Sequence, residues 1–294
     1  MYGYVHMAAR IFLEEIFLRG AVMKILIAGL GLIGGSMAKA LVRAGYKADG
    51  FDRDAVTAAA RRAGAIASMA GDFKNYDLVL IALPPDETMR LLDTAEFKDG
   101  AIVADICGVK TAVGQIVRSK KRNYRYVGCH PMAGKEVSGF ANSDETLFDG
   151  ASMIIVEDEQ TDRAAADLLQ ELFYKMGFSF IRRCSAGYHD RKIAYTSQLA
   201  HIVSNAYVKS ETADDYRGFT GGSFQDMTRI AGVDERIWTR LYFLNRDNIA
   251  GELRGLIFEL NKYLCALEEG KEDDLRDLLK EGRLRKEKLD GQAD

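Results

Sequence analysis

A glycine-rich turn near the start of the chain constrains its fold more than any other feature. Residues 29–34 read Gly-Leu-Gly-Leu-Ile-Gly, and they follow an apolar segment, 24–28, that is typical of a buried strand. A helical pattern with small residues on one face then runs from Gly35 to Gly45. In such a turn the first glycine permits a tight bend, the second lets the backbone approach a pyrophosphate, and the third lets the helix pack closely on the strand. Because the helix N-terminus then faces the phosphates, the pattern predicts a dinucleotide-binding Rossmann unit.

An acidic residue after the next strand indicates which dinucleotide is bound. Residues 48–51 are predicted to form a second strand that ends at Asp52, about 20 residues beyond the glycine turn. A carboxylate at this place accepts hydrogen bonds from the ribose of NAD and repels the 2′-phosphate of NADP. The neighbouring Arg53 could accept that phosphate or remain a solvated charge at the strand end. We therefore expect NAD.

Strand and helix patterns alternate after this unit and predict an α/β Rossmann domain over residues 23–184. Near-continuous apolar runs are typical of parallel strands covered on both faces, and the cofactor should lie at their carboxyl ends. Further strands are expected at 77–83, 101–105, 125–129, 152–156 and 178–182, with a helix at 161–176. The residues expected to contact the cofactor are Gly29, Gly31, Leu32, Ile33, Gly34, Asp52, Arg53, Leu83 and Pro84.

Strand patterns stop at Ser185, and residues 185–294 are predicted to form an all-α domain for substrate binding and dimerisation. A glycine-containing loop is expected at 214–226. The expected helices are 187–212, 227–231, 234–252, 255–269 and 272–289. Such a domain should pack over the cofactor side of the sheet. An apolar helical stripe suggests a homodimer, and it consists of Leu253, Leu256, Ile257, Leu260 and Leu264.

The composition is that of an ordinary globular protein and argues against several classes of partner. The chain has 294 residues, of which 48% are hydrophobic, and a formal net charge of −3. A near-neutral balance gives no reason to expect nucleic acid or a membrane surface as partner. No apolar run reaches the roughly 18 residues that a spanning helix needs. Four scattered cysteines without a CxxC spacing indicate reduced thiols in a cytoplasmic protein, and with the scattered histidines they predict no metal site.

The first 22 residues stand apart from this plan. Residues 11–19 could form a short amphipathic helix, but the segment is too charged for a signal peptide. Met23 directly precedes the first Rossmann strand and is a candidate natural start. We therefore expect residues 1–22 to be an N-terminal extension that is not native.

A few polar residues are candidates for chemistry on a substrate. His130 is expected to follow a strand on the cofactor side, where an imidazole can accept a proton near neutral pH. His201 lies on the long helix beside its apolar face, where it could also be a hydrogen-bonded core histidine. Asp226 and Arg229 are three residues apart and would share a helix face. Arg229 could bind a substrate carboxylate or form a structural ion pair with Asp226.

These residues lie in motifs through which the chain resembles the prephenate/arogenate dehydrogenase family of tyrosine biosynthesis. The motifs match in order: GLGLIGGS with its acid, HPMAGKEVSGF, LAH on the long helix, and GGSFQDMTRIA followed by Trp238. They cover the chain from Met23 to about Lys288. The β-hydroxyacid dehydrogenases and pyrroline-carboxylate reductases share the two-domain plan, but they explain neither HPMAG nor DMTRIA.

The resemblance implies oxidation of prephenate to 4-hydroxyphenylpyruvate, with a hydride passing to NAD and the ring carboxylate leaving as carbon dioxide. It implies that His130 is the catalytic residue that takes the proton of the ring hydroxyl. Arg229 would bind the ring carboxylate, and His201 would lie near the substrate side chain. The other expected substrate contacts are Glu136, Asp226, Gly134 and Lys135.

One position departs from the family pattern. Many members carry a serine in a DxxSxK segment, where its hydroxyl assists the base, whereas this chain has Gly108. Cys107, Thr111 or a water could replace that hydroxyl. Two alternative functions stay open: an arogenate dehydrogenase that makes tyrosine directly, and an NAD-binding regulatory protein with a decayed site. We expect neither the chorismate mutase helices nor the ACT domain found in some members.

Overall fold

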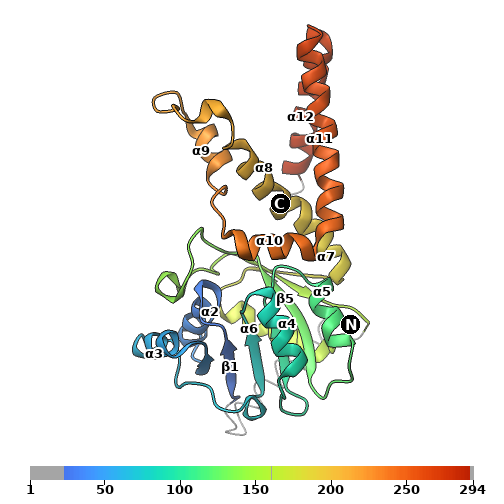
Figure 1. The fold of residues 1–294 in the computed structure, drawn as a ribbon. Coiled ribbons are helices and arrows are strands. Elements are labelled where there is room, and N and C mark those ends of the chain that lie inside the picture. Colours follow the sequence, from blue (N-terminus) through green and yellow to red (C-terminus); the bar gives the residue numbers. More distant parts are fainter. Residues whose placement is uncertain (1–22, 160, 292–294) are drawn as a thin grey trace.

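The computed structural model describes residues 23–159 and 161–291, which form a Rossmann domain and a helical domain (Figure 1). The predicted helix at 11–19, and the extension of residues 1–22 to which it belongs, lie outside the described residues. No helix in the described part of the chain is long and apolar enough to cross a membrane.

Within the described residues, seven strands form one sheet in the order β2-β1-β3-β4-β5-β6-β7. Neighbours from β2 to β5 run parallel, β6 is antiparallel to β5, and β7 is parallel to β6. The bounds are Ile25–Ala28 (β1), Ala48–Phe51 (β2), Leu78–Ile81 (β3), Ile102–Asp105 (β4), Arg125–Pro131 (β5), Ser152–Val156 (β6) and Phe180–Cys184 (β7). The predicted Rossmann domain is confirmed, with an antiparallel step at β6 that the alternation of strands and helices does not reveal.

Helices cover both faces of the sheet because its strands are apolar on both sides. In β1, Ile25 and Ile27 belong to one buried cluster, and Leu26 and Ala28 belong to the other, as a period of two requires. The helices over the first face are α2 (Leu32–Arg43), α3 (Asp54–Arg62) and α6 (Arg163–Lys175). The helices over the second face are α4 (Pro85–Thr94) and α5 (Thr111–Arg118). Both faces are thus filled, and the carboxyl ends of the strands remain for function.

The helical domain begins with one rod that changes its helical type. The segments α7 (Ala186–Ile193), the π-helix η3 (Ala194–Leu199) and α8 (Ala200–Tyr207) follow one another directly. The predicted helix 187–212 is confirmed over most of its length but ends at Tyr207. A short 3-10 turn follows at Glu211–Ala213, where the hydroxyl of Ser210 accepts from the backbone N–H of Thr212, and serine favours such turns over a helix interior.

The break between the next helices lies elsewhere than predicted. The structure has α10 (Glu235–Leu244) and α11 (Arg246–Glu268) where helices were expected at 234–252 and 255–269. The chain departs from helical geometry at Asn245, whose buried side chain binds groups on the preceding rod. The two glycines inside α11, Gly251 and Gly255, do not interrupt it, because each costs a helix only about 1 kcal/mol.

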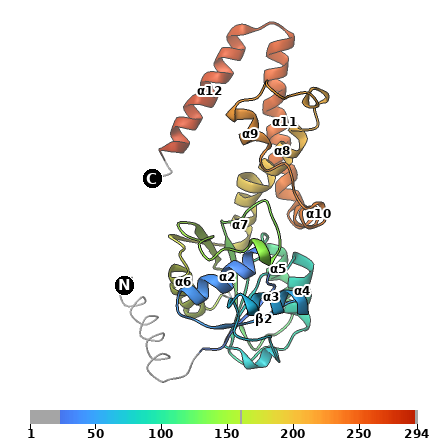
Figure 2. The same cartoon turned by 90° about the vertical axis from the view of Figure 1, so that its left-hand side faces the viewer.

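Two further elements complete the domain. Helix α9 (Gly222–Thr228) starts earlier than expected, so the predicted loop 214–226 is too long and the predicted helix 227–231 is wrong. Helix α12 (Glu272–Asp290) agrees with its prediction. It pairs with α11 in a hairpin that projects away from the Rossmann domain (Figure 2). On this hairpin, three residues of the predicted dimer stripe are exposed: Ile257, Leu260 and Leu264.

Candidate active site

The glycine turn has a different structural demand at each of its glycines. Gly29 adopts a φ of +93°, and a Cβ there would overlap the carbonyl of Ala82 on the neighbouring strand. A Cβ at Gly34 would overlap the carbonyl oxygen of Gly29, so only glycine lets α2 start so close to β1. A Cβ at Gly31 would meet nothing within 4 Å. Gly31 therefore offers open backbone at a helix N-terminus, which fits a pyrophosphate.

The carboxylate of Asp52 is held at the end of β2, beside this turn. It accepts hydrogen bonds from the backbone N–H of Leu30, at 2.7 Å, and from that of Arg53, also at 2.7 Å. The Arg53 side chain is 88% exposed and its Nε lies 3.8 Å from Asp52. The carboxylate thus faces the nucleotide side in a fixed position, whereas the guanidinium is a solvated charge. This arrangement fits the ribose of NAD.

The remaining predicted cofactor contacts lie at the same edge of the sheet. Leu32 and Ile33 form the first turn of α2, and Leu83 packs against the second core cluster. Pro84 is exposed and is the N-cap of α4, which begins at Pro85. The predicted strand 77–83 is therefore shorter at its end, because the two prolines start a helix instead.

His130 lies within a strand rather than after it. Strand β5 continues to Pro131, and His130 pairs with Ile154 of the antiparallel β6. The prediction that the strand stops at residue 129 is therefore wrong by two residues. The ladder with β6 fixes the backbone of His130, which is partly buried at the carboxyl edge of the sheet.

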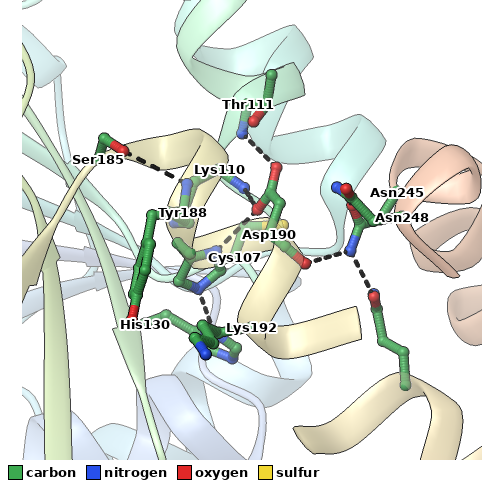
Figure 3. A network of polar contacts seen from close by, with 12 residues as sticks. Cys107, Lys110, Thr111, His130, Ser185, Tyr188, Asp190, Lys192, Asn245 and Asn248 are labelled. Atoms are coloured by element: carbon green, nitrogen blue, oxygen red, sulfur yellow. Dashed lines mark hydrogen bonds and ion pairs between the residues drawn. The ribbon is translucent and has the colours of Figure 1, made fainter. Parts of the chain in front are cut away.

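The imidazole of His130 is the first member of a hydrogen-bonded chain. Its Nδ1 lies 2.9 Å from Nε2 of His189, and Nδ1 of His189 lies 2.7 Å from Oδ1 of Asp190. Asp190 also accepts hydrogen bonds from the backbone N–H groups of Lys110 and Thr111, both at 2.9 Å. Figure 3 shows Asp190, on α7, between Thr111 and Asn245. This hydrogen-bonded chain of His130, His189 and Asp190 thus joins the Rossmann strands to the first helix of the second domain.

The surroundings of this chain favour neutral histidines. Burial holds the pKa of His130 well below the ordinary histidine value, and His189 and Lys110 lower it further, against an opposing effect of Asp190. Burial also lowers the pKa of His189, although its hydrogen bond to Asp190 acts in the opposite direction. Burial alone would raise the pKa of Asp190. The hydrogen bonds that its carboxylate accepts outweigh the effect of burial, so the pKa is lowered. Near neutral pH, His130 can therefore accept a proton.

A buried ion pair supports the strand ends below the histidines. The ammonium of Lys110 contacts Asp105 at 2.5 Å and donates to the carbonyl of Cys129 at 2.6 Å. The hydroxyl of Tyr126 donates to the other oxygen of Asp105 at 2.6 Å. Removing one partner of such a buried pair typically costs roughly 3–5 kcal/mol. The pair locks β4 to β5 directly before His130.

The side of His130 that does not face His189 lies against Gly108. A Cβ built at Gly108 would lie 3.6 Å from Nε2 of His130 and 3.6 Å from Cδ2 of Leu241. Cys107 does not replace the missing hydroxyl, because it is buried in the second core cluster and burial raises its pKa to about 11. Thr111 starts α5, and its backbone N–H binds Asp190.

Arg229 pairs with Glu136 and not with Asp226. Its Nη1 lies 2.5 Å from Oε1 of Glu136, so the end of α9 contacts the loop after β5. Asp226 is exposed and has no hydrogen bond or ion pair within the described chain. The structural ion pair with Asp226 considered from the sequence is therefore wrong. Lys135, which was expected to contact the substrate, forms an ion pair with Asp144, with its Nζ 3.0 Å from Oδ2.

His201 lies against Trp238 on the facing helix. The ring centroids are 4.0 Å apart, and Nδ1 of His201 lies 2.9 Å from the carbonyl oxygen of Ile230, to which it donates. Trp238 is three residues before Leu241, so both share a face of α10. Because Leu241 lies beside Gly108, this face places His201 and Trp238 over the same edge of the sheet as His130.

Three polar residues of this region were missed by the sequence analysis: Lys110, His189 and Asp190. The adjacent His-Asp pair in the first helix after the last strand is a signal that could have indicated two of them. Its partner His130 is 59 residues earlier in the chain, so only the fold reveals the contact. No three side chains of the metal-binding types converge within residues 23–159 and 161–291.

Comparisons with known proteins agree with this geometry. The sequence-family model of the prephenate dehydrogenase nucleotide-binding domain matches residues 37–182. The sequence-family model of the prephenate dehydrogenase dimerization domain matches residues 185–281. The chain is 30% identical over 286 residues to prephenate dehydrogenase of Bacillus subtilis, covering 91% of this chain and 75% of that protein. It is 28% identical to cyclohexadienyl dehydrogenase of Zymomonas mobilis, covering 88% of this chain and 93% of that protein.

A solved structure extends the comparison to bound ligands. Prephenate dehydrogenase from A. aeolicus in complex with hydroxyphenyl propionate and NAD+ has a TM-score of 0.81 to this chain at 26% sequence identity. The alignment covers 92% of this chain and 99% of that one. Both domains are therefore arranged as in a protein that binds an aromatic acid and a dinucleotide together.

Proposed function

Because the chain belongs to the prephenate dehydrogenase family, we propose how its residues carry out the NAD-dependent oxidative decarboxylation of prephenate. The product is 4-hydroxyphenylpyruvate, formed as the ring loses a hydride and its carboxylate and becomes aromatic. NAD supplies the hydride acceptor when it is bound. The observation that carries the proposal is the position of His130, a neutral and partly buried base at the edge of the sheet that also holds the glycine turn.

His130 is the proposed catalytic residue. Its Nδ1 is occupied by His189, so Nε2 is the remaining ring nitrogen, and it faces the position beside Gly108. A ring hydroxyl placed there would donate its hydrogen bond to Nε2. As carbonyl character develops on that carbon, the proton moves to Nε2, and it returns to the oxygen when the ring becomes aromatic. Such a base typically contributes about 10²–10⁴-fold to the rate.

Positively charged and hydrogen-bonding groups are needed for the two carboxylates of the substrate. We assign the ring carboxylate to Arg229, whose planar guanidinium suits bidentate binding. Glu136 holds this guanidinium in place before the substrate arrives. His201 has an Nε2 free of its backbone bond and is assigned to the substrate side chain. The further substrate contacts that we propose are Gly134, Lys135 and Asp226.

For the cofactor we propose the contacts expected from the sequence. Gly31 and the first turn of α2 would hold the pyrophosphate, and Asp52 the adenosine ribose. The open backbone at Gly31 and the fixed carboxylate support this assignment. Arg53, Leu83 and Pro84 would line the nucleotide on its outer side.

The assembly and location that we propose follow from the second domain and the thiols. We propose a homodimer through residues 185–294, supported by the match to a dimerization domain and by exposed leucines on α11. Sedimentation that finds only monomer at micromolar concentration would refute it. A cytoplasmic location is supported by the four cysteines, which are all free. The boundary at residues 184 and 185 falls between β7 and α7.

The test is the initial rate of NADH formation with prephenate and with arogenate at equal concentration. We expect fast turnover of prephenate, and a much lower rate with NADP in place of NAD because of Asp52. Preference for arogenate would move the assignment within the family and direct attention to the surroundings of His201. No rate with either substrate would contradict the proposal and favour a binding protein with a decayed site.

A further inference from the structure

We propose that His189 and Asp190 are positioning residues that fix the tautomer of His130, with the proton on Nδ1 and the lone pair on Nε2. The role of this tautomer in catalysis rests on the proposed function. The tautomer itself is a property of the folded chain and can be observed without any substrate.

The direction of each hydrogen bond follows from the donors around Asp190. The backbone N–H of Lys110 donates to Oδ1 of Asp190, and the backbone N–H of Thr111 donates to Oδ2. A backbone N–H can only be a donor. Both oxygens are thereby fixed as acceptors of a carboxylate. Nδ1 of His189, which lies 2.7 Å from Oδ1, must therefore be the donor.

The direction at Asp190 sets the direction at His130. A neutral His189 with its proton on Nδ1 has only a lone pair on Nε2. That lone pair lies 2.9 Å from Nδ1 of His130, which must carry the proton. The lone pair of His130 then lies on Nε2, the atom of the ring nearest to a Cβ built at Gly108.

A doubly protonated His189 would reverse this result, and its surroundings disfavour it. It would donate from Nε2 and force the proton of His130 onto the catalytic nitrogen. The His189 side chain is fully buried, and the Lys110 ammonium near it adds a like charge, so both effects lower its pKa. The negative charges that favour a proton on His189 are those of Asp190 and Asp105, and Lys110 neutralises Asp105 directly.

The hydrogen-bonded chain from Asp190 through His189 to His130 also has a function during the proton transfer. When His130 receives the hydroxyl proton at Nε2, its Nδ1–H bond remains intact and no second proton has to move. The new positive charge is then stabilised through His189 by the carboxylate of Asp190. Hydrogen-bonded chains polarise one another in a low-dielectric site. In the Ser-His-Asp triad of serine proteases a buried carboxylate likewise orients the catalytic histidine, and the wrong histidine tautomer lowers kcat about 10⁴-fold.

The direct test is nitrogen-15 NMR of histidine-labelled protein at pH 7. The chain has four histidines, so each signal can be assigned by substitution. We expect His130 and His189 to be protonated at Nδ1 and not at Nε2. A proton on Nε2 of His130 in the free protein would overturn the proposal, whatever the enzyme turns over.

The second arm is kinetic and uses His189→Asn. The amide nitrogen of asparagine can keep the bond to Asp190, but this shorter side chain has no atom at the position of Nε2, which accepts from His130. We expect kcat to fall about 10- to 100-fold, with KM for prephenate and Kd for NAD changed less than about twofold. In the NMR spectrum of this variant, His130 should show a proton on Nε2 in part of the population. His189→Phe serves as a second variant if the first does not fold.

The matched control is Asn248→Ala. The side-chain amide of Asn248 donates to Oδ1 of Asn245 at 2.7 Å, and the hydrogen bonds between the two histidines and Asp190 do not include it. We expect wild-type kcat and the wild-type tautomer of His130. An unchanged kcat in His189→Asn, or a loss in kcat without a change of tautomer, would overturn the positioning role. If wild-type protein does not oxidise prephenate, the proposed function fails, and the NMR arm still decides the tautomer.

Discussion

The glycine turn and the histidine chain lie at the same edge of the sheet but are built from different parts of the chain. The turn is one continuous run, 29–34, in which Gly29 and Gly34 leave no room for a Cβ and Gly31 leaves the backbone open. The histidine chain joins β5, the loop before α5 and helix α7, whose residues are far apart in the sequence. The first can therefore form within one βα unit, and the second exists only when both domains are packed.

This difference teaches that binding of the cofactor and chemistry on the substrate should be separable. Changes in the turn should alter the affinity for NAD and leave the histidines in place. Changes at the domain junction should alter turnover and leave NAD binding unchanged. The following substitutions and conditions test this separation, from the largest expected effect to the smallest.

Arg229→Gln should have the largest effect among these changes. It removes the charged partner of a substrate carboxylate, and charge-assisted hydrogen bonds contribute roughly 1.5–3 kcal/mol. We expect kcat/KM for prephenate to fall about 10- to 100-fold, mainly through KM, with an unchanged Kd for NAD. Steady-state kinetics and a NAD titration measure both quantities.

Arg240→Gln is the matched control for that change. Arg240 contacts Asp86 across the same domain junction, with Nε 2.7 Å from Oδ1, but has no proposed role in substrate binding. We expect kinetics close to wild type. An equal loss in both variants would mean that Arg229 acts through the packing of the domains and not through the substrate.

Gly31→Ala should affect only the cofactor side. The new methyl group meets no protein atom within 4 Å, so the melting temperature should stay at the wild-type value. It does occupy backbone surface that a pyrophosphate would approach, so we expect Kd for NAD to rise about tenfold, or about 1.4 kcal/mol. Thermal unfolding and a NAD titration measure the two effects.

Gly34→Ala distinguishes steric cost from ligand binding in the same turn. Its methyl group would overlap the carbonyl oxygen of Gly29, so the turn must shift. We expect a loss of about 1–3 kcal/mol in the free energy of unfolding, as for overpacked sites. If Gly31→Ala destabilises the protein as much as Gly34→Ala does, the assignment of the two glycines is wrong.

Acid should weaken the histidine chain before it affects the rest of the Rossmann domain. The pKa values of His130 and His189 are held below the ordinary value of about 6.5, so the unfolded state binds more protons once the pH falls below it. The contribution of these histidines to the free energy of unfolding is therefore fully present above about pH 6.5. It decreases as the pH falls below that value, by up to about 1.4 kcal/mol for each histidine and each pH unit. Calorimetry between pH 8 and 5 should show a falling melting temperature, with a smaller slope in His189→Asn. A melting temperature that stays constant over this range would contradict the buried neutral pair.

Gly108→Ser should have the smallest effect. A Cβ at this position is in ordinary contact distance of His130, so the fold should tolerate it. The added hydroxyl can donate to the substrate oxygen, and one hydrogen bond contributes about 0.5–1.5 kcal/mol. We expect kcat to rise, by less than about tenfold. A decrease in kcat would show that the added side chain disturbs His130 or the substrate beside it.

The parts of the molecule that could be predicted are those whose partners are close in sequence. The turn, Asp52 and the strands β1 to β4 follow from local patterns because each contact lies within one or two elements. The antiparallel β6 could not be predicted, because an apolar strand of five residues carries no sign of its direction.

The catalytic side was only partly predictable for the same reason. His130 and Arg229 were identified through motifs, but Arg229 pairs with a residue 93 positions away and not with its helical neighbour. The helix break at Asn245 depends on contacts with Asp190 and Gln198, which no local propensity encodes. Residues that act through another residue leave the weakest sequence signal.

The central claim is that His130 is the base for oxidation of prephenate, and His130→Asn tests it most directly. Asparagine keeps a polar side chain of similar reach at the strand end but cannot accept the hydroxyl proton. Measured together in one preparation, kcat with prephenate should fall about 10²–10⁴-fold while Kd for NAD stays within about twofold. An unchanged kcat in a folded variant that binds NAD would contradict the claim.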